Sequence, residues 1–406
     1  MTARTPRPTA VLPFADALSA ALDVAVLSPS SHNCQPWGLA GMVSAPARRR
    51  AAAVLGGPRA GREYLVLALD RERRLGALPA HAAEMLLSCG LYWRLLQRAL
   101  AAQGWVAERS ETVAGPGAPP ALGLPPSWEP LCAAEFRRAG EPDGDLGDLG
   151  ELRALARRRH TNRAPYRSGA VEPELLTALE RPGGTVPGGT GPASTGPAGT
   201  GPASMGDGPA VAVRRLASWP ERARFADFVA RHAGRDFAHG GAWRETHSFL
   251  RWSAAEAAER GDGFTLEHLF GPMPARDRWA RRLALAPAAM AVLGRAGYPR
   301  LLAGRLAAVV RRSPVIVMMS LPEQEPGVRD VLAASAVLAD YWLAATAAGL
   351  VLHPVSIVIQ HEDLRRALQR RFGVPGRVFF VARLGRPAAG FPRSPRRPAA
   401  AAFREL

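Results

Sequence analysis

The sequence predicts an α+β fold made of two similar units that follow each other along the chain. In each half, short apolar runs that are typical of buried strands alternate with helical segments. Each half also contains one long apolar helix, at 80–104 and at 331–352, which leads through a glycine into a further strand. With only two copies and a long period, this pattern indicates an internal duplication and not a solenoid.

The first half consists of helices and strands around two polar stretches, 28–37 and 159–166. A loop rich in proline and glycine, 114–126, separates two of its strands. The expected elements are a helix at 14–27, an apolar stretch at 38–43, a strand at 64–69, a helix at 80–104, strands at 105–111 and 131–138, and helices at 148–158 and 172–179.

The second half begins after a stretch of small and polar residues, 182–209, whose single large apolar side chain is Met205. Such a segment cannot bury enough surface to fold, so we expect a flexible linker or an insertion. The sequence therefore predicts one unit at 1–181 and another at 210–406. The expected elements of the second unit are a strand at 210–216, helices at 219–231 and 243–259, a helix-rich region at 278–304, a strand at 314–320, helices at 331–352 and 362–372, and a strand at 377–382.

The helical segment at 331–352 is nearly uncharged and almost long enough to span a bilayer. Asp340 lies in its middle, Gly349 lies near its end, and the chain has no second segment of this kind. A charged residue at mid-membrane depth is costly, so the segment is interpreted as a buried core helix.

The basic residues of the chain are all arginine. The 406 residues include 52 Lys and Arg, none of them lysine, and the net charge is +17. Without a lysine there is no Schiff base, no attachment of pyridoxal phosphate and no phosphate-loop lysine. Arginine, serine or backbone amides must therefore bind any phosphate. Because the arginines are spread along the chain, the charge by itself gives only weak support for nucleic-acid binding.

Cys34, Cys89 and Cys132 are widely spaced and odd in number, which argues against a disulfide framework and against a zinc site. The first ten residues have no apolar segment of the kind found in signal peptides. We therefore expect a reduced, cytoplasmic protein.

The polar loop Ser28-Pro-Ser-Ser-His-Asn-Cys-Gln-Pro-Trp37 places short hydrogen-bonding side chains between two prolines. The prolines prevent the preceding helix from continuing. Serine, histidine, asparagine and glutamine can together bind a ligand rich in carbonyls, ring nitrogens and hydroxyls. The alternative is an ordinary surface turn, since Ser, Asn and Pro are common turn residues.

Four common catalytic and cofactor-binding motifs are absent from the sequence. There is no G-x-S-x-G, H-E-x-x-H or C-x-x-C, and no G-x-G-x-x-G before a helix. Two polar loops and a basic tail remain, and these match the needs of flavin mononucleotide (FMN). Its phosphate requires guanidinium groups, while its ribityl and pyrimidine groups require amides and hydroxyls.

The first polar loop resembles the A-P-S-S-H-N-T-Q-P-W segment of the nitroreductase superfamily. With Arg159-His-Thr-Asn-Arg163, Pro354-Val-Ser356, Leu384-Gly-Arg-Pro387 and Ser394-Pro-Arg-Arg-Pro398, the chain is similar to the fused, two-copy Acg-like branch. Ser28 and Cys34 stand where the family usually has Ala and Thr.

The resemblance implies a nitroreductase-like α/β sandwich, in which the two units pack as an intrachain pseudo-dimer around one FMN. It also implies NADH or NADPH as a transient electron donor, and a segment that covers the flavin, for which 243–263 is the candidate lid. No catalytic side chain is assigned. The residues implied to bind the cofactor are Ser30, Ser31, His32, Asn33, Gln35, Arg159, Asn162, Arg163, Pro354, Val355, Ser356, Arg396 and Arg397.

Each of these assignments has a structural alternative. Arg159 and Arg163 could pair with a local carboxylate such as Glu172, and His32 could be a hydrogen-bonded structural residue. The main functional hypothesis is an oxidoreductase that transfers hydride through flavin N5 to or from a small organic substrate, such as a nitro compound, quinone, enone or biosynthetic intermediate. The alternative is a protein that stores FMN without turnover. We expect no nucleic-acid or membrane partner, and a monomer or weak homodimer.

Overall fold

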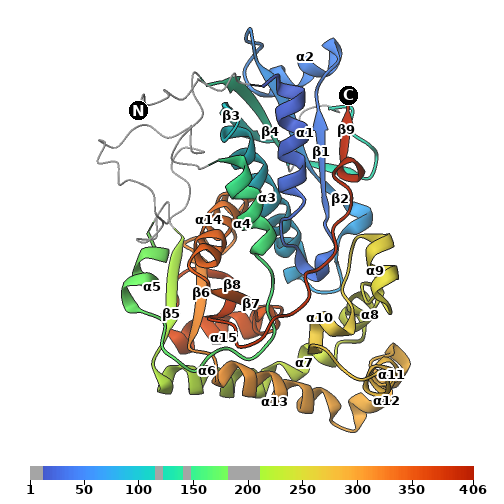
Figure 1. Ribbon diagram of the computed structural model, residues 1–406, viewed down its shortest axis with the longest axis vertical. Helices are drawn as coiled ribbons and strands as arrows, with labels where there is room; N and C mark the ends of the chain where they lie inside the picture. Colours follow the sequence, from blue (N-terminus) through green and yellow to red (C-terminus); the bar gives the residue numbers. More distant parts are fainter. Residues whose placement is uncertain (1–11, 115–121, 140–147, 182–210) are drawn as a thin grey trace, which may run out of the picture.

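The computed structural model describes residues 12–114, 122–139, 148–181 and 211–406. The predicted linker, 182–209, lies outside these described residues. The described part combines helices with two separate β-sheets, which confirms the predicted α+β fold (Figure 1).

A five-stranded sheet forms the centre of the first unit. Its strands lie in the order β3-β4-β2-β1-β9, and all neighbours are antiparallel except β1 and β9. The elements are α1 (Phe14–Ala25), β1 (Trp37–Gly41), α2 (Ala45–Val54), β2 (Glu63–Asp70), α3 (Ala80–Ala101), β3 (Trp105–Thr112), β4 (Trp128–Arg138), α4 (Leu149–Arg158) and, from the end of the chain, β9 (Phe403–Glu405).

A four-stranded antiparallel sheet forms the centre of the second unit, in the order β5-β6-β8-β7. Counted from β1, the first sheet runs β1-β2-β4-β3, so both sheets follow one pattern, as a tandem duplication requires. The elements are β5 (Ala212–Leu216), β6 (Val315–Leu321), α14 (Val328–Ala347), β7 (Val351–Pro354), α15 (Glu362–Phe372) and β8 (Arg377–Gly385).

The two long helices, α3 and α14, pack against each other and join the units. Gly90 of α3 allows the close approach, because a Cβ there would lie 2.5 Å from Ser335 Cβ on α14. Beside this contact, Arg94 and Arg98 donate hydrogen bonds of 2.7 and 2.9 Å to the carboxylate of Asp340. α14 is long and apolar enough to cross a membrane, but it lies in the protein core, as predicted. The predicted helix was too long, because Val351–Pro354 forms β7.

The end of the chain returns to the first unit. After β8, the last residues run across the molecule and add β9 to the first sheet, parallel to β1, with Phe403 opposite Leu39 (Figure 1). The sequence analysis missed β9, because three residues give no recognisable period.

A group of helices is inserted between β5 and β6. Its members are α6 (Trp219–His232), α7 (Gly234–Phe237), α8 (Gly240–Ser248), α9 (Ala254–Arg260), α10 (Leu266–Phe270), α11 (Ala275–Ala284), α12 (Pro287–Arg295) and α13 (Tyr298–Arg311). The single helix predicted at 243–259 is wrong. Leu250 forms a bridge with Phe264, and the side chain of Ser253 caps a new helix by accepting a hydrogen bond from the Glu256 amide, so the chain divides into α8 and α9.

The segment that follows α4 packs on the second sheet. Thr161 forms a bridge with Leu352, and Tyr166 forms one with Pro387. Helix α5 (Pro173–Leu179) contributes Leu176 and Leu179 to the cluster of β6 and α14. The unit boundaries at 181 and 210 remain a prediction, and this packing places 160–179 spatially with the second unit.

Candidate functional site

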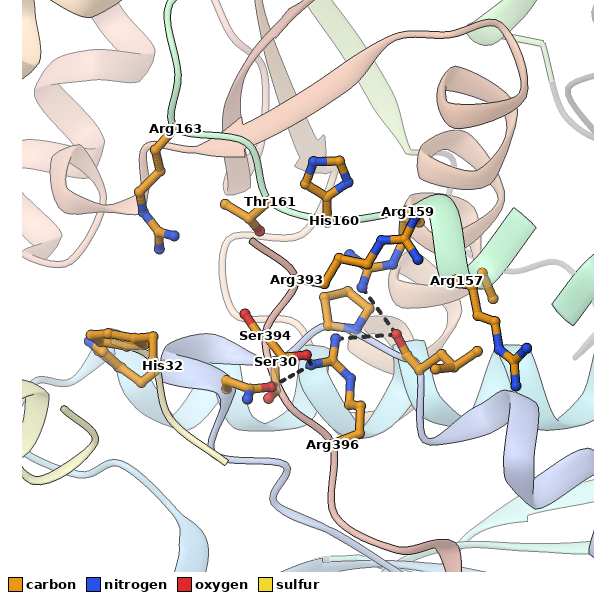
Figure 2. Close-up of a pocket in the computed structure, with 15 residues that line it drawn as sticks. Ser30, His32, Arg157, Arg159, His160, Thr161, Arg163, Arg393, Ser394 and Arg396 are labelled. Carbon is orange, nitrogen blue, oxygen red and sulfur yellow. Dashed lines mark hydrogen bonds between the residues drawn. The ribbon is translucent and has the colours of Figure 1, made fainter. Parts of the chain in front are cut away.

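A cavity of about 300 Å³ lies where the two units and the end of the chain meet (Figure 2). This volume is at the lower end of the range for small-molecule sites. Both predicted polar loops and the predicted basic tail contribute to its walls. The lining residues are Leu27, Pro29, Ser30, His32, Asn33, Ala156, Arg157, Arg159, His160, Thr161, Arg163, Phe264, Arg393, Ser394 and Arg396.

The first polar loop has an unusual backbone. His32, Asn33 and Gln35 have φ values of 51°, 53° and 51°, and they are the only described residues other than glycine with positive φ. A residue with a Cβ adopts this left-handed conformation at a cost, so the surrounding structure must hold it in place. Three such residues in one loop mark the loop as a candidate functional element.

Asn33 and Gln35 hold that loop against two other segments. The Asn33 side-chain amide donates hydrogen bonds of 3.0 Å to the carbonyls of Gly263 and Pro395. The Gln35 amide donates a bond of 2.7 Å to the Gly261 carbonyl and accepts one of 3.1 Å from the Arg397 backbone amide. The two side-chain amides therefore hold the first polar loop, the 261–263 segment and the tail together.

Arginine dominates the charge of the cavity. Five lining residues are arginine, and none of the described residues that line it carries a carboxylate. Burial lowers the pKa of Arg159 to about 9, with a further contribution from the nearby Arg396, and burial lowers the pKa of Arg396 to about 10. Burial also lowers the pKa of Arg163 to about 10. Each lowered pKa means that the protein alone stabilises the charged form of that guanidinium poorly.

Arg159 and Arg396 share one protein acceptor. Both donate to the carbonyl oxygen of Leu27, just beyond the end of α1, at 3.0 and 3.4 Å (Figure 2). The end of a helix carries partial negative charge, which favours guanidinium groups there. The Arg159 guanidinium also lies 4.9 Å from the centre of the Trp342 ring.

Several guanidinium nitrogens at the cavity are buried without a partner. Nε and Nη1 of Arg159 and Nε of Arg396 have no hydrogen-bond acceptor among the described residues. Buried donors are normally satisfied, so these atoms are free to bind an acceptor from outside the protein. The donor set suits an anion with several oxygens, such as a phosphate group.

His32 is neutral at ordinary pH. Burial, His81 and Arg163 lower its pKa to about 3. Its Nε2 lies 3.1 Å from Thr246 Oγ1, and its ring faces Phe264 at 6.0 Å between centres. A neutral ring adds no charge to the cavity, which leaves the arginines to set its potential.

A chain of hydrogen bonds links the first polar loop to the second unit. Ser31 donates to Glu84 at 2.5 Å, and Gln360 donates to the other oxygen of Glu84 at 2.6 Å. Gln360 Nε2 also lies 3.4 Å from Ser356 Oγ. These contacts hold Ser356 and Ser31, the residue between the lining residues Ser30 and His32, in fixed positions.

The structure brings six of the thirteen predicted residues into the cavity wall: Ser30, His32, Asn33, Arg159, Arg163 and Arg396. The other seven do not line it. Ser31 and Ser356 belong to the series of hydrogen bonds that passes through Glu84, and Gln35 bonds to the Gly261 carbonyl. Asn162 donates to the Ala389 carbonyl, and Arg397 donates to the Ala401 carbonyl. Pro354 is the last residue of β7, and Val355 follows it.

Sequence reasoning missed several lining residues. Arg157, His160 and Thr161 adjoin the predicted Arg159, and Arg393 and Ser394 precede the predicted Arg396, so a wider window around each motif would have included them. Phe264 lies one residue beyond the predicted lid, 243–263, and no local pattern identifies it. The last residues of that lid contact the first loop, because the Gly263 amide donates to the Asn33 carbonyl at 3.3 Å.

The chain is similar to known proteins along nearly its whole length. No protein-family model matches it. It is 29% identical over 390 residues to the probable NAD(P)H nitroreductase PigM of Serratia sp. (strain ATCC 39006), a match that covers 95% of this chain and 92% of PigM.

Two solved structures resemble the chain at lower identity. A putative nitroreductase from Anabaena variabilis ATCC 29413 has a TM-score of 0.47 and 10% identity, and covers 94% of this chain and 90% of its own. The FMN-dependent nitroreductase NfnB from Mycobacterium smegmatis, in complex with NADPH, has a TM-score of 0.34 and 17% identity, and covers 61% of this chain and 96% of its own.

Proposed function

Since this chain belongs to the nitroreductase superfamily, we propose that it is an FMN-dependent oxidoreductase that acts on a small organic substrate with NADH or NADPH as electron donor. The reaction transfers hydride to or from a nitro compound, a quinone, an enone or a biosynthetic intermediate.

The observation that carries this proposal is a set of arginines without an anionic partner, of which Arg159 is buried and Arg163 and Arg396 are half-buried. Five arginines line a cavity in which no described lining residue is Asp or Glu. Three buried guanidinium nitrogens of Arg159 and Arg396 lack an acceptor. The phosphate of FMN carries close to two negative charges at neutral pH and three acceptor oxygens, so it fits this donor set.

The remaining lining residues fit the other parts of FMN. Ser30, Thr161 and Ser394 offer hydroxyls for the ribityl chain and the pyrimidine edge. Leu27 and Phe264 offer apolar surface for the ring system. Bound FMN would supply two-electron transfer through N5 of its ring.

The residues of the chain act by binding and positioning. Arg159 and Arg396 would hold the phosphate, while Asn33 fixes Arg396 and the Gly263 turn in place. Phe264 would give one side of the cavity an apolar surface from which water is displaced when FMN binds. Ser31, Gln35, Asn162, Pro354, Val355, Ser356 and Arg397 are proposed to support these groups from outside the cavity wall.

The test is a titration of the purified protein with FMN, followed by anaerobic mixing with NADH or NADPH. We expect stoichiometric binding of one FMN, loss of the oxidised flavin absorbance on addition of the donor, and its return when a quinone or nitroaromatic acceptor is added. Binding without reduction or reoxidation would favour the storage protein. A protein that does not bind FMN at all contradicts the whole proposal.

The proposal includes the state of the protein in the cell. A reduced cytoplasmic protein suits its three buried, unpaired cysteines. Because both units of the pseudo-dimer belong to one chain, a monomer can form the complete site. Light scattering at several concentrations distinguishes this monomer from a weak homodimer.

A further inference from the structure

Helix α11 has no buried residue, although it carries large apolar side chains. Trp279 is 65% exposed and Leu283 is 50% exposed. The two residues are four positions apart, so they lie one above the other on the same face of the helix. An amphipathic helix of this kind is stable when its apolar face is covered, and no described part of the chain covers this one.

The next two helices also carry exposed apolar side chains. Val292 of α12 is 67% exposed, and Leu301 near the start of α13 is 49% exposed. Helices α11 and α12 lie at one corner of the molecule, and α13 extends from there along its lower edge (Figure 1). We call Trp279, Leu283, Val292 and Leu301 the apolar face.

The surroundings of the apolar face are strongly cationic. Residues 275–301 contain six arginines and one aspartate, Asp277. Among the described residues, Arg281, Arg282, Arg295 and Arg300 form no ion pair with a carboxylate. Arg281 and Arg282 instead lie over the rings of Phe270 and Trp252, at 4.4 and 4.9 Å. Any large partner must therefore accept both apolar side chains and positive charge.

We infer that the apolar face docks on the surface of an anionic lipid bilayer. On α11, Arg278 and Arg282 precede Trp279 and Leu283 by one position each, so both lie along one side of that face; Arg278 also pairs with Glu267 at 2.6 Å. Arginines beside a tryptophan and a leucine are typical of helices that lie in the membrane interface, where the long cationic side chains reach the headgroups. A second copy of this chain would bring two arginine-rich surfaces together, and a nucleic acid would leave the aliphatic side chains uncovered.

Side-chain packing links the helices of the proposed docking surface to the wall of the cavity. Phe264, which lines the cavity, belongs to the same apolar cluster as Leu285 after α11 and Met290 of α12. A substrate dissolved in the bilayer would therefore meet the protein at the helices that support one cavity wall. The sequence analysis expected no membrane partner because it searched only for spanning segments, which a surface helix does not resemble.

The test is co-sedimentation of the full chain with vesicles of phosphatidylcholine alone and of phosphatidylcholine mixed with phosphatidylglycerol. We expect binding to the anionic vesicles, weaker binding as salt is raised, and little binding to the neutral ones. The double variant Trp279→Ser/Leu283→Ser should lower the partition coefficient by about tenfold or more.

The matched control is Trp219→Ser. Trp219 is 57% exposed but lies on α6, outside the apolar face, so this variant should bind like the wild type. Equal binding of the double variant, or no binding to anionic vesicles, overturns the inference. It is also overturned if the chain prefers duplex DNA to these vesicles, or if Trp279→Ser/Leu283→Ser abolishes a concentration-dependent dimer.

Discussion

Asn33 Oδ1 accepts a hydrogen bond of 2.9 Å from Nη1 of Arg396, across 363 positions of the sequence. The same asparagine donates to the carbonyls of Gly263 and Pro395. One side chain of the first unit therefore orients an arginine of the tail and holds the segment that ends the candidate lid. Asn33 therefore joins three segments that border the cavity.

We predict that Asn33→Ala weakens FMN binding by about tenfold or more, since Arg396 loses its one side-chain acceptor among the described residues and a hydrogen bond of this kind contributes about 1–3 kcal/mol. Quenching of flavin fluorescence during titration measures the dissociation constant. An unchanged constant in a folded variant would show that Arg396 needs no such support.

Arg159→Gln should change binding and stability in opposite directions. Loss of a charged donor should weaken FMN binding by about 1.5–3 kcal/mol, or roughly tenfold to a hundredfold. The FMN-free variant should unfold at a higher temperature than the wild type, because it no longer buries a poorly stabilised charge.

The control for Arg159→Gln is Arg158→Gln. Arg158 is exposed, immediately precedes Arg159 and does not line the cavity. The Arg158→Gln variant should change the affinity for FMN and the melting temperature no more than an ordinary surface substitution does. A lower melting temperature for Arg159→Gln without FMN would mean that the Leu27 and Trp342 contacts outweigh the cost of burial.

FMN affinity should depend on pH through the arginines and the phosphate. In the free protein the pKa is about 9 for Arg159 and about 10 for Arg396. Bound phosphate favours the charged guanidinium, so affinity should fall as pH rises through this range. It should also fall below about pH 6, where the phosphate takes up a proton. Titrations at several pH values should therefore give a plateau between about 6 and 9; constant affinity up to pH 10 contradicts this account.

Gly90→Ala should destabilise the protein by about 1–3 kcal/mol, because the new Cβ would meet Ser335 at 2.5 Å and push α3 away from α14. Gly294→Ala is the control. Gly294 also lies in a helix, but a Cβ there meets no atom within 4 Å, so this change should stabilise the protein by about 0.5–1 kcal/mol. Chemical denaturation compares the two, and equal effects would mean that the helices do not pack as closely as described.

The sequence predicted much of the fold because its strong elements are long and apolar. The helix predicted at 362–372 has the observed bounds, and the runs around β6 and β8 were found within a few residues. The weaker elements depend on tertiary pairing. β7 and β9 were missed because they gain their hydrogen bonds from strands far away in the sequence.

The sequence predicted which segments form the candidate site better than it predicted which residues line the cavity. The two polar loops and the tail meet at one cavity, but Gln35 and Asn162 direct their amides to backbone carbonyls of other segments. A sequence shows that such a side chain can bind a ligand, and it does not show which acceptor lies closest after folding. Phe264 belongs to a loop whose position depends on the bond between Asn33 and Gly263.

The central claim is that buried arginines bind the phosphate of FMN, and the most direct measurement compares the affinities of FMN and riboflavin by flavin fluorescence. Riboflavin has the same ring and ribityl chain but no phosphate. The account predicts that riboflavin binds at least about a hundredfold more weakly, since several charge-assisted hydrogen bonds are lost, and that Arg159→Gln reduces this difference. Equal affinity for the two flavins, in wild type and variant alike, would contradict it.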